Sequence, residues 1–214
     1  MHIPEGMLPG AVCIAGYALT SAAMWYSLKQ INKKEDPHKE IPKAALLTAA
    51  FFISTFILIP IPPASVHPML IGIIGAMLGY FAFPAITIAL FFQAVLFQHG
   101  GITTLGVNAF LFGTSALLSY YVYLYAARIF QSKKYQQVIA GFLAGISGVA
   151  VTVFLFYLVL ILFLPTTLDV ETEKKAIMLL SLSHFPIMIL EGVFSASLFG
   201  YLSKMKPQLI EVIK

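Results

Sequence analysis

A long uncharged stretch dominates this sequence, because residues 44–127 contain no Asp, Glu, Lys or Arg. That length accommodates several membrane spans, each of which needs about 20 apolar residues. Across the whole chain, 59% of the residues are hydrophobic and only 10% are charged. The strands of a β-barrel would alternate apolar and polar residues, whereas these runs are apolar throughout. The sequence therefore predicts an all-α, polytopic membrane protein in which residues 1–214 form a single membrane domain.

Apolar runs divide the chain into about seven expected transmembrane helices. The third and fourth are short and meet at Phe83-Pro84, so each is expected to be tilted, broken or only partly spanning. Pro84 fits the end of one helix and the first turn of the next. The expected helices cover residues 10–30, 43–59, 68–82, 84–98, 106–130, 136–164 and 176–203.

The formal net charge of +4 comes from basic residues clustered in a few short segments. This pattern indicates membrane orientation rather than nucleic-acid binding. With seven spans the basic segments and the C-terminus share one side, expected to be cytoplasmic, and the N-terminus lies outside. No basic region precedes the first apolar run, so a cleaved signal peptide is not expected. The basic residues expected on the cytoplasmic side are Lys29, Lys33, Lys34, Lys39 and Lys43, then Arg128, Lys133 and Lys134, and finally Lys204, Lys206 and Lys214, whereas Lys174 and Lys175 belong to a mixed-charge segment at 165–175 expected outside.

The first residues, Met1-His2-Ile3-Pro4-Glu5-Gly6, are interpreted as a metal-binding terminus. The Met1 amine, the His2 amide and the His2 imidazole would close a five-membered and a six-membered chelate ring on one cation, and the planar peptide brings these donors toward one plane. A fourth nitrogen would complete a square, which suits Ni(II) or Cu(II) better than Zn(II) or Mg(II). The alternative is a solvated, loose terminus.

Two further segments on the expected external side offer polar groups. Three prolines forbid a helix just before His67, so an ordered turn is expected to present this residue ahead of a helix that begins at Pro68. His67 would supply the fourth nitrogen, or else cap that helix or face water. Residues 98–108 form a glycine-rich break, which at membrane depth must line a cavity or lie within protein. Candidate groups to support the chelate from these segments are Ser65, His99, Thr103, Thr104 and Asn108.

His184 and Glu191 lie within the last apolar run, where ionisable residues are costly. They share a helix face but are too far apart along it to be neighbours. Glu191 is expected to pair inside the bundle or to stay protonated. No HExxH pattern is present, so an intramembrane metalloenzyme is rejected, and no resident cofactor is expected. A proton-coupled secondary metal carrier, with Glu191 as its relay, remains the alternative function.

Four motifs, in this order along the chain, resemble those of the CbiM/NikM family. Its members are the substrate-capture components of energy-coupling-factor transporters for cobalt and nickel in prokaryotic cytoplasmic membranes. The resemblance implies a metal-binding segment and helix at 1–30 added to a six-helix core at 43–203, with Met1, His2 and His67 as the metal ligands. His99 is not assigned as a direct ligand. The motifs are Met1-His2-Ile3-Pro4-Glu5-Gly6, Ser65-Val66-His67-Pro68, the segment from His99 to Asn108, and His184-Phe185-Pro186 with Glu191-Gly192.

The resemblance also implies partners for uptake of Ni²⁺ or Co²⁺. They are a transmembrane coupling subunit, cytoplasmic ATPase subunits and a small accessory membrane protein. This fits the sequence, which has no G-x-x-x-x-G-K-[ST] phosphate-binding loop and so cannot itself couple ATP hydrolysis. The motifs do not separate nickel from cobalt.

Overall fold

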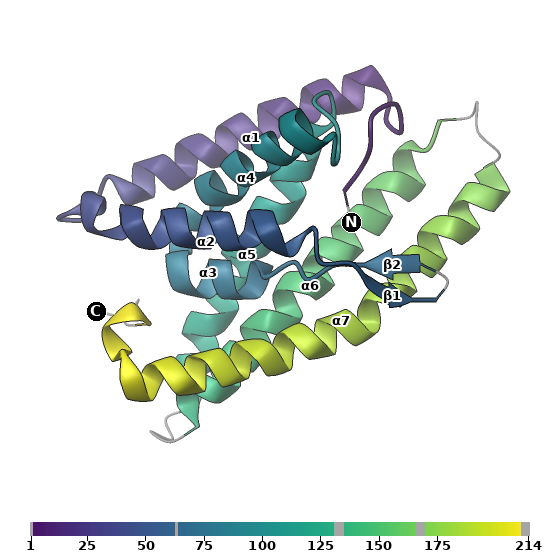
Figure 1. The fold of residues 1–214 in the computed structure, drawn as a ribbon. Coiled ribbons are helices and arrows are strands. Elements are labelled where there is room, and N and C mark those ends of the chain that lie inside the picture. Colours follow the sequence, from purple (N-terminus) through teal and green to yellow (C-terminus); the bar gives the residue numbers. More distant parts are fainter. Residues whose placement is uncertain (1, 63, 131–134, 166–169, 211–214) are drawn as a thin grey trace.

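The structure is a computed structural model that describes residues 2–62, 64–130, 135–165 and 170–210. Within these ranges the chain forms seven α-helices, three 3-10 turns and one two-stranded hairpin (Figure 1). The helices are α1 (Gly10–Ile31), α2 (Ile41–Ser54), α3 (Ile71–Leu78), α4 (Ala82–Phe97), α5 (Leu105–Ile129), α6 (Gln136–Phe163) and α7 (Val170–Met205). The strands are β1 (Ile59–Ile61) and β2 (Ala64–Val66), and 3-10 turns lie at Pro37–Glu40, Gly79–Phe81 and Pro207–Leu209.

Five segments of the described chain are long and apolar enough to cross a membrane. They are α1, the joined α3 and α4 (Ile71–Phe97), α5, α6 and α7. Helix α2 has only 14 residues, fewer than a typical span needs. The helical, multi-span architecture is therefore confirmed, whereas the number of seven crossings and the orientation of the termini remain predictions.

The second helix is shorter than its apolar run suggested. It ends at Ser54 rather than at residue 59, and Ile59–Ile61 forms β1 instead. This strand pairs antiparallel with β2, and Pro60 lies opposite Ser65. Pro60 lacks an N–H, so it could not continue a helix, but it is tolerated in a short edge strand. The expected turn before His67 is thus a hairpin, and the purely all-α assignment was wrong at this point.

Three other boundaries differ from the expected ones, and the first is the start of α3, which lies at Ile71 rather than at Pro68. The break between α3 and α4 lies at Gly79–Phe81 rather than at Phe83-Pro84, and Gly79 has a φ of +56°, which glycine adopts readily. Helix α7 begins at Val170 rather than at residue 176. Its first turn carries Glu171 and Glu173, whose negative charge is favourable at a helix N-terminus.

Helix α5 forms the centre of the bundle and contacts α1, α3, α4 and α6. Helices α6 and α7 pack along each other, and α2 lies beside α4. Small residues permit the close approaches between helices, as in other membrane bundles. A methyl group added to Gly16 of α1 would lie 2.7 Å from the backbone nitrogen of Val107 in α5, and one added to Gly145 of α6 would lie 2.9 Å from the Cα of Gly192 in α7.

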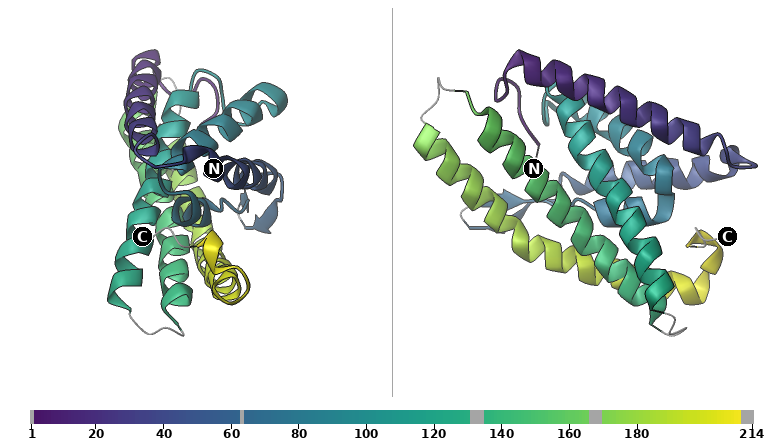
Figure 2. Two further views of the ribbon diagram at one scale, coloured as in Figure 1. Left: turned by 90° about the vertical axis from the view of Figure 1, so that its left-hand side faces the viewer. Right: turned by 180° about the vertical axis from the view of Figure 1, so that it is seen from behind.

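The two ends of the bundle carry different chemistry. The lysine-rich connection at residues 32–40 and the C-terminal turn at Pro207–Leu209 lie toward one end (Figures 1 and 2). The N-terminal segment, the β1–β2 hairpin and the connection between α4 and α5 lie toward the other. The three segments expected to hold the metal therefore meet toward one end of the molecule, away from the lysine-rich connection at residues 32–40.

Candidate metal centre

The N-terminal segment is held inside the bundle by α5. The Ile3 N–H donates to Asn108 Oδ1 (2.9 Å), and the Ile3 carbonyl accepts from Asn108 Nδ2 (3.0 Å) and Thr104 Oγ1 (2.7 Å). The Ile3 side chain is fully buried. Because both backbone groups of Ile3 are satisfied, this segment can lie in an apolar interior without an unpaired peptide group.

Glu5 anchors the same segment from the other side. Its carboxylate accepts from the Thr103 N–H (3.2 Å to each oxygen) and from the Thr103 hydroxyl. These hydrogen bonds from Thr103 lower the pKa of Glu5, so the group is ionised at neutral pH. A methyl group added to Gly101 would lie 2.5 Å from a Glu5 oxygen, so only glycine leaves room for the carboxylate here.

These two anchors position His2 deep in the bundle. Its ring stacks on Phe112 of α5, with ring centroids 5.0 Å apart and planes 22° apart. Phe112 lies seven residues into α5, or roughly 10 Å below the start of the helix at 1.5 Å per residue. Both ring nitrogens of His2 are buried, and neither has a hydrogen-bond partner among the described residues. A ring with an unpartnered buried nitrogen can offer that nitrogen to a ligand.

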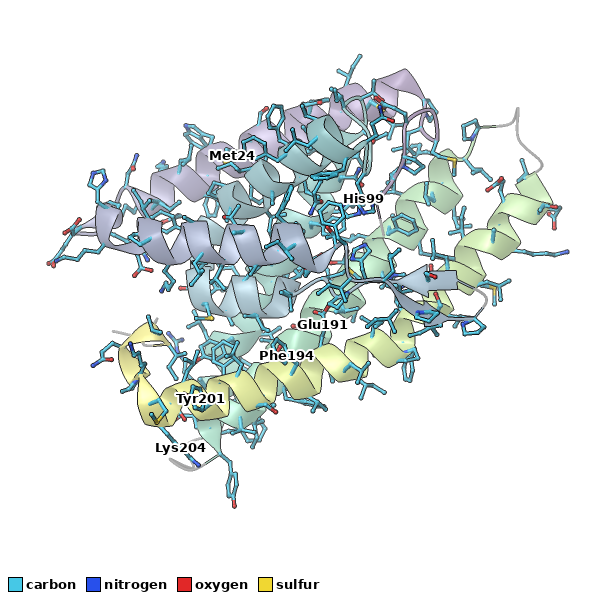
Figure 3. The ribbon with its side chains drawn as sticks, viewed as in Figure 1. Met24, His99, Glu191, Phe194, Tyr201 and Lys204 are labelled. Atoms are coloured by element: carbon cyan, nitrogen blue, oxygen red, sulfur yellow. The ribbon has the colours of Figure 1, made fainter. Side chains whose placement is uncertain are left out.

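Three histidines from three separate segments meet at this position. The ring centroid of His2 lies 5.5 Å from that of His67 and 4.3 Å from that of His99. One nitrogen from each of the three rings can be chosen so that all lie within 4.8 Å of one another. Figure 3 shows His99 beside the N-terminal segment. Imidazole is a common ligand of nickel, cobalt, copper and zinc, so this cluster can hold a transition-metal ion.

The protonation of these histidines favours binding of a cation. Burial lowers the pKa of His67 to about 3, and it also lowers the pKa values of His2 and His99. All three rings are therefore neutral near pH 7, as metal ligation requires. His67 Nδ1 lies 3.2 Å from the Pro68 carbonyl, which can only accept. A proton on Nδ1 would satisfy this contact, and Nε2 would then be the His67 nitrogen that carries the lone pair.

The backbone that follows His67 is anchored by Glu191 of α7. One oxygen of this buried carboxylate accepts from the Met69 N–H and from the Leu70 N–H (3.1 Å). Leu70 has a φ of +53°, a left-handed conformation that is unfavourable for leucine and must be stabilised by its surroundings. Glu191 therefore fixes the turn that carries His67, and the expectation that it pairs inside the bundle is confirmed. His184 lies apart from this contact, with Nδ1 2.7 Å from the Leu180 carbonyl of its own helix.

The structure brings together most of the residues selected from the sequence. His2, His67 and His99 form the cluster, and Thr103, Thr104 and Asn108 hold the N-terminal segment. Ser65 lies exposed on β2, so its supporting role remains a prediction. Met1 lies outside the described residues, and its amine as a ligand remains a prediction as well. Gln93 and Phe112 were not selected. The signal for Gln93 was its amide in the otherwise apolar α4, since a buried polar group in a span is costly.

Comparison with known proteins identifies relatives of this chain along nearly its whole length. The family model CbiM, described as the cobalt uptake substrate-specific transmembrane region, matches residues 2–209. A putative metal transport protein of Haemophilus influenzae is 31% identical over 210 residues, which cover 98% of this chain and 97% of that protein. The cobalt transport protein CbiM of Clostridium tetani is 32% identical over 219 residues, covering 100% of this chain and 88% of that protein.

A solved structure shares the fold. The crystal structure of a truncated transition metal transporter superposes with a TM-score of 0.77 at 27% identity, covering 96% of this chain and 99% of that chain. The fold, the cluster and these relatives together define a multi-pass prokaryotic membrane protein of metal transport, not an enzyme. The chain belongs to the CbiM family, whose members are transport components that act with other subunits.

Proposed function

We propose that this protein captures Ni²⁺ or Co²⁺ at the outer face of a prokaryotic cytoplasmic membrane as the substrate-binding component of an energy-coupling-factor transporter. The observation that carries the proposal is that the half-buried His2 and the buried His67 meet in one cluster, while Asn108 holds Ile3, the residue after His2, by two hydrogen bonds. The names of the relatives support cobalt or a similar transition metal as the cargo.

The proposed ligands are four nitrogens: the amine of Met1, the amide and imidazole of His2, and the imidazole of His67. The hydrogen bonds of Ile3 support this set, because they hold the peptide that follows His2 in one orientation. His99 lies edge-on to His2, with an interplanar angle of 66°, and borders the open face of such a planar centre. Planar nitrogen coordination favours Ni(II) over Zn(II), which prefers a tetrahedron.

The proposed partners are a transmembrane coupling subunit, cytoplasmic ATPase subunits and a small accessory membrane protein. The sequence holds no phosphate-binding loop of its own, which supports separate ATPase subunits. The alternative, a proton-coupled carrier, would use Glu191 as a relay. Two backbone N–H groups already bind that carboxylate, which supports a structural role for it instead.

The test is a metal titration of purified protein with Met1 as its first residue. Ni(II) and Co(II) are added and binding is followed by absorbance, in parallel with a version that carries Gly-Ser before Met1. A matched control carries the same dipeptide after Lys214. We expect the N-terminal extension to abolish binding and the C-terminal one to leave it intact. Equal binding by all three forms would remove the amine from the site.

A further inference from the structure

Gln93 is a fully buried polar residue in an apolar helix, and its amide is oriented by α2. Its Nε2 donates to Thr55 Oγ1 (2.9 Å) and to the Phe52 carbonyl (3.4 Å). Only the amide nitrogen can donate, so these two acceptors fix which way the amide faces. The nitrogen faces the end of α2, and the oxygen faces away from it.

The backbone of Gln93 also takes part in building the site. Its carbonyl accepts from the N–H of Gln98 and from the N–H of His99 (3.1 Å), which closes α4. Gln98 has a left-handed φ of +52°, as the C-terminal residue of such a closing turn often does. Gln93 therefore determines where the chain leaves α4 toward His99.

Gln93 lies close to His2, because its backbone carbonyl binds the N–H of His99, whose ring centroid is 4.3 Å from that of His2. Oε1 is buried and has no hydrogen-bond partner among the described residues, and the same holds for both ring nitrogens of His2. Burial lowers the pKa of His2, and the Gln93 side chain acts against this shift, as an acceptor beside a ring N–H does. A neutral imidazole always carries one N–H, so a single hydrogen bond would satisfy an orphan donor and an orphan acceptor at once.

We infer that Gln93 is a positioning residue for metal capture, whose Oε1 accepts the Nε2–H of His2 and so leaves Nδ1 free to bind the ion. This inference rests on the proposed function. Nδ1 is the nitrogen that forms a six-membered ring with the amide of the same residue, whereas Nε2 is too far around the ring to do so. In His67 the other ring nitrogen would carry the proton, because Nδ1 lies beside the Pro68 carbonyl, which can only accept. The two histidines thus present opposite ring nitrogens to the ion.

Substitutions that separate the acceptor from the shape of the side chain test this inference. Gln93→Met keeps the length and removes the acceptor, and we expect it to weaken binding of Ni(II) and Co(II) about 10- to 100-fold, as loss of a group that orients a metal-bound histidine does. Gln93→Glu keeps an oxygen acceptor and should recover most of the lost affinity. Gln208→Met, at an exposed position in the C-terminal turn, is the matched control and should bind as the unchanged protein does. Equal affinity of Gln93→Met and the unchanged protein would overturn the inference.

A second measurement determines which nitrogen of the His2 ring carries the proton. ¹⁵N NMR of metal-free protein with ring-labelled histidine distinguishes Nε2–H from Nδ1–H imidazole. We expect His2 to be the Nε2–H form in the unchanged protein and a mixture of both forms in Gln93→Met. A predominant Nδ1–H form in the unchanged protein would contradict the inference. If the unchanged protein binds neither ion, the proposed function fails, while the NMR result still decides how the ring is oriented.

Discussion

Asn108 and Ile3 form a reciprocal pair of hydrogen bonds across 105 positions of sequence, with the Ile3 N–H donating to Oδ1 and Nδ2 donating to the Ile3 carbonyl. A neighbouring β-strand would satisfy a peptide in the same way. Here one side chain of a central helix performs this task for a segment that has no strand beside it. The position of His2, one residue earlier, is therefore set by α5.

We predict that Asn108→Leu weakens metal binding about tenfold or more. The substitution keeps the volume but leaves the Ile3 N–H buried without an acceptor, which costs about 1–3 kcal/mol, and 1.4 kcal/mol is a factor of ten in affinity. The Ile3 carbonyl keeps its bond from Thr104. Isothermal titration with Ni(II) and Co(II) measures the effect. Asn32→Leu is the control, because Asn32 is exposed in the connection after α1; similar losses in both variants would contradict the assigned role of Asn108.

Glu191→Leu should weaken metal binding and lower the melting temperature together. It removes the acceptor of two N–H groups and releases the left-handed Leu70, with an expected loss of roughly 3 kcal/mol. Glu191→Gln retains an oxygen acceptor and should lose much less. Thermal unfolding in detergent and metal titration provide the two measurements.

The matched control for Glu191 is Glu171→Leu, at an exposed position in the first turn of the same helix. It should leave metal affinity unchanged. If Glu191→Gln instead loses transport while its metal binding and melting temperature are normal, the carboxylate has a proton-transfer role, and the secondary-carrier function regains support.

The slope of the metal affinity against pH should equal the number of protons that the ion displaces. Chelation removes one proton from the His2 amide and, below the usual amine pKa of about 7.7–8, one from the Met1 amine. The imidazoles add none above pH 5, because burial holds the pKa of His67 at about 3 and lowers that of His2. The logarithm of the affinity should therefore fall by about 2 per unit as pH drops from 7 to 5. Competition titrations measure this slope; a value near 4 below pH 6 would mean that both imidazoles titrate normally.

The sequence was informative where chemistry is local. Helices α1, α5 and α6 follow their apolar runs closely, since nothing in those runs interrupts a helix. The chelate at Met1 and His2 and the candidate ligand His67 came from residue type and from the expected side of the membrane. The gathering of His2, His67 and His99 agrees with that reasoning.

The remaining features depend on contacts that no local pattern encodes. Residues 56–59 are all apolar although they lie between α2 and β1 or begin β1, so hydropathy did not show where the helix ends. The roles of Gln93 and Glu191 arise from α2 and α3, which lie far from them in sequence. A lone amide or carboxylate in an apolar helix indicates that a partner exists, and only the fold identifies it.

Gly16→Ala should destabilise the protein and also weaken metal binding. The new methyl group would lie 2.7 Å from the Val107 backbone nitrogen, which cannot rotate away, so α1 and α5 must separate next to Asn108. Overpacking of this kind costs about 1–3 kcal/mol, more than the gain of up to about 1 kcal/mol from replacing a helical glycine. Gly10→Ala, where no atom lies within 4 Å, is the control and should be neutral or slightly stabilising. Thermal unfolding in detergent compares the two, and equal melting temperatures would show that the α1–α5 contact is not close in the native protein.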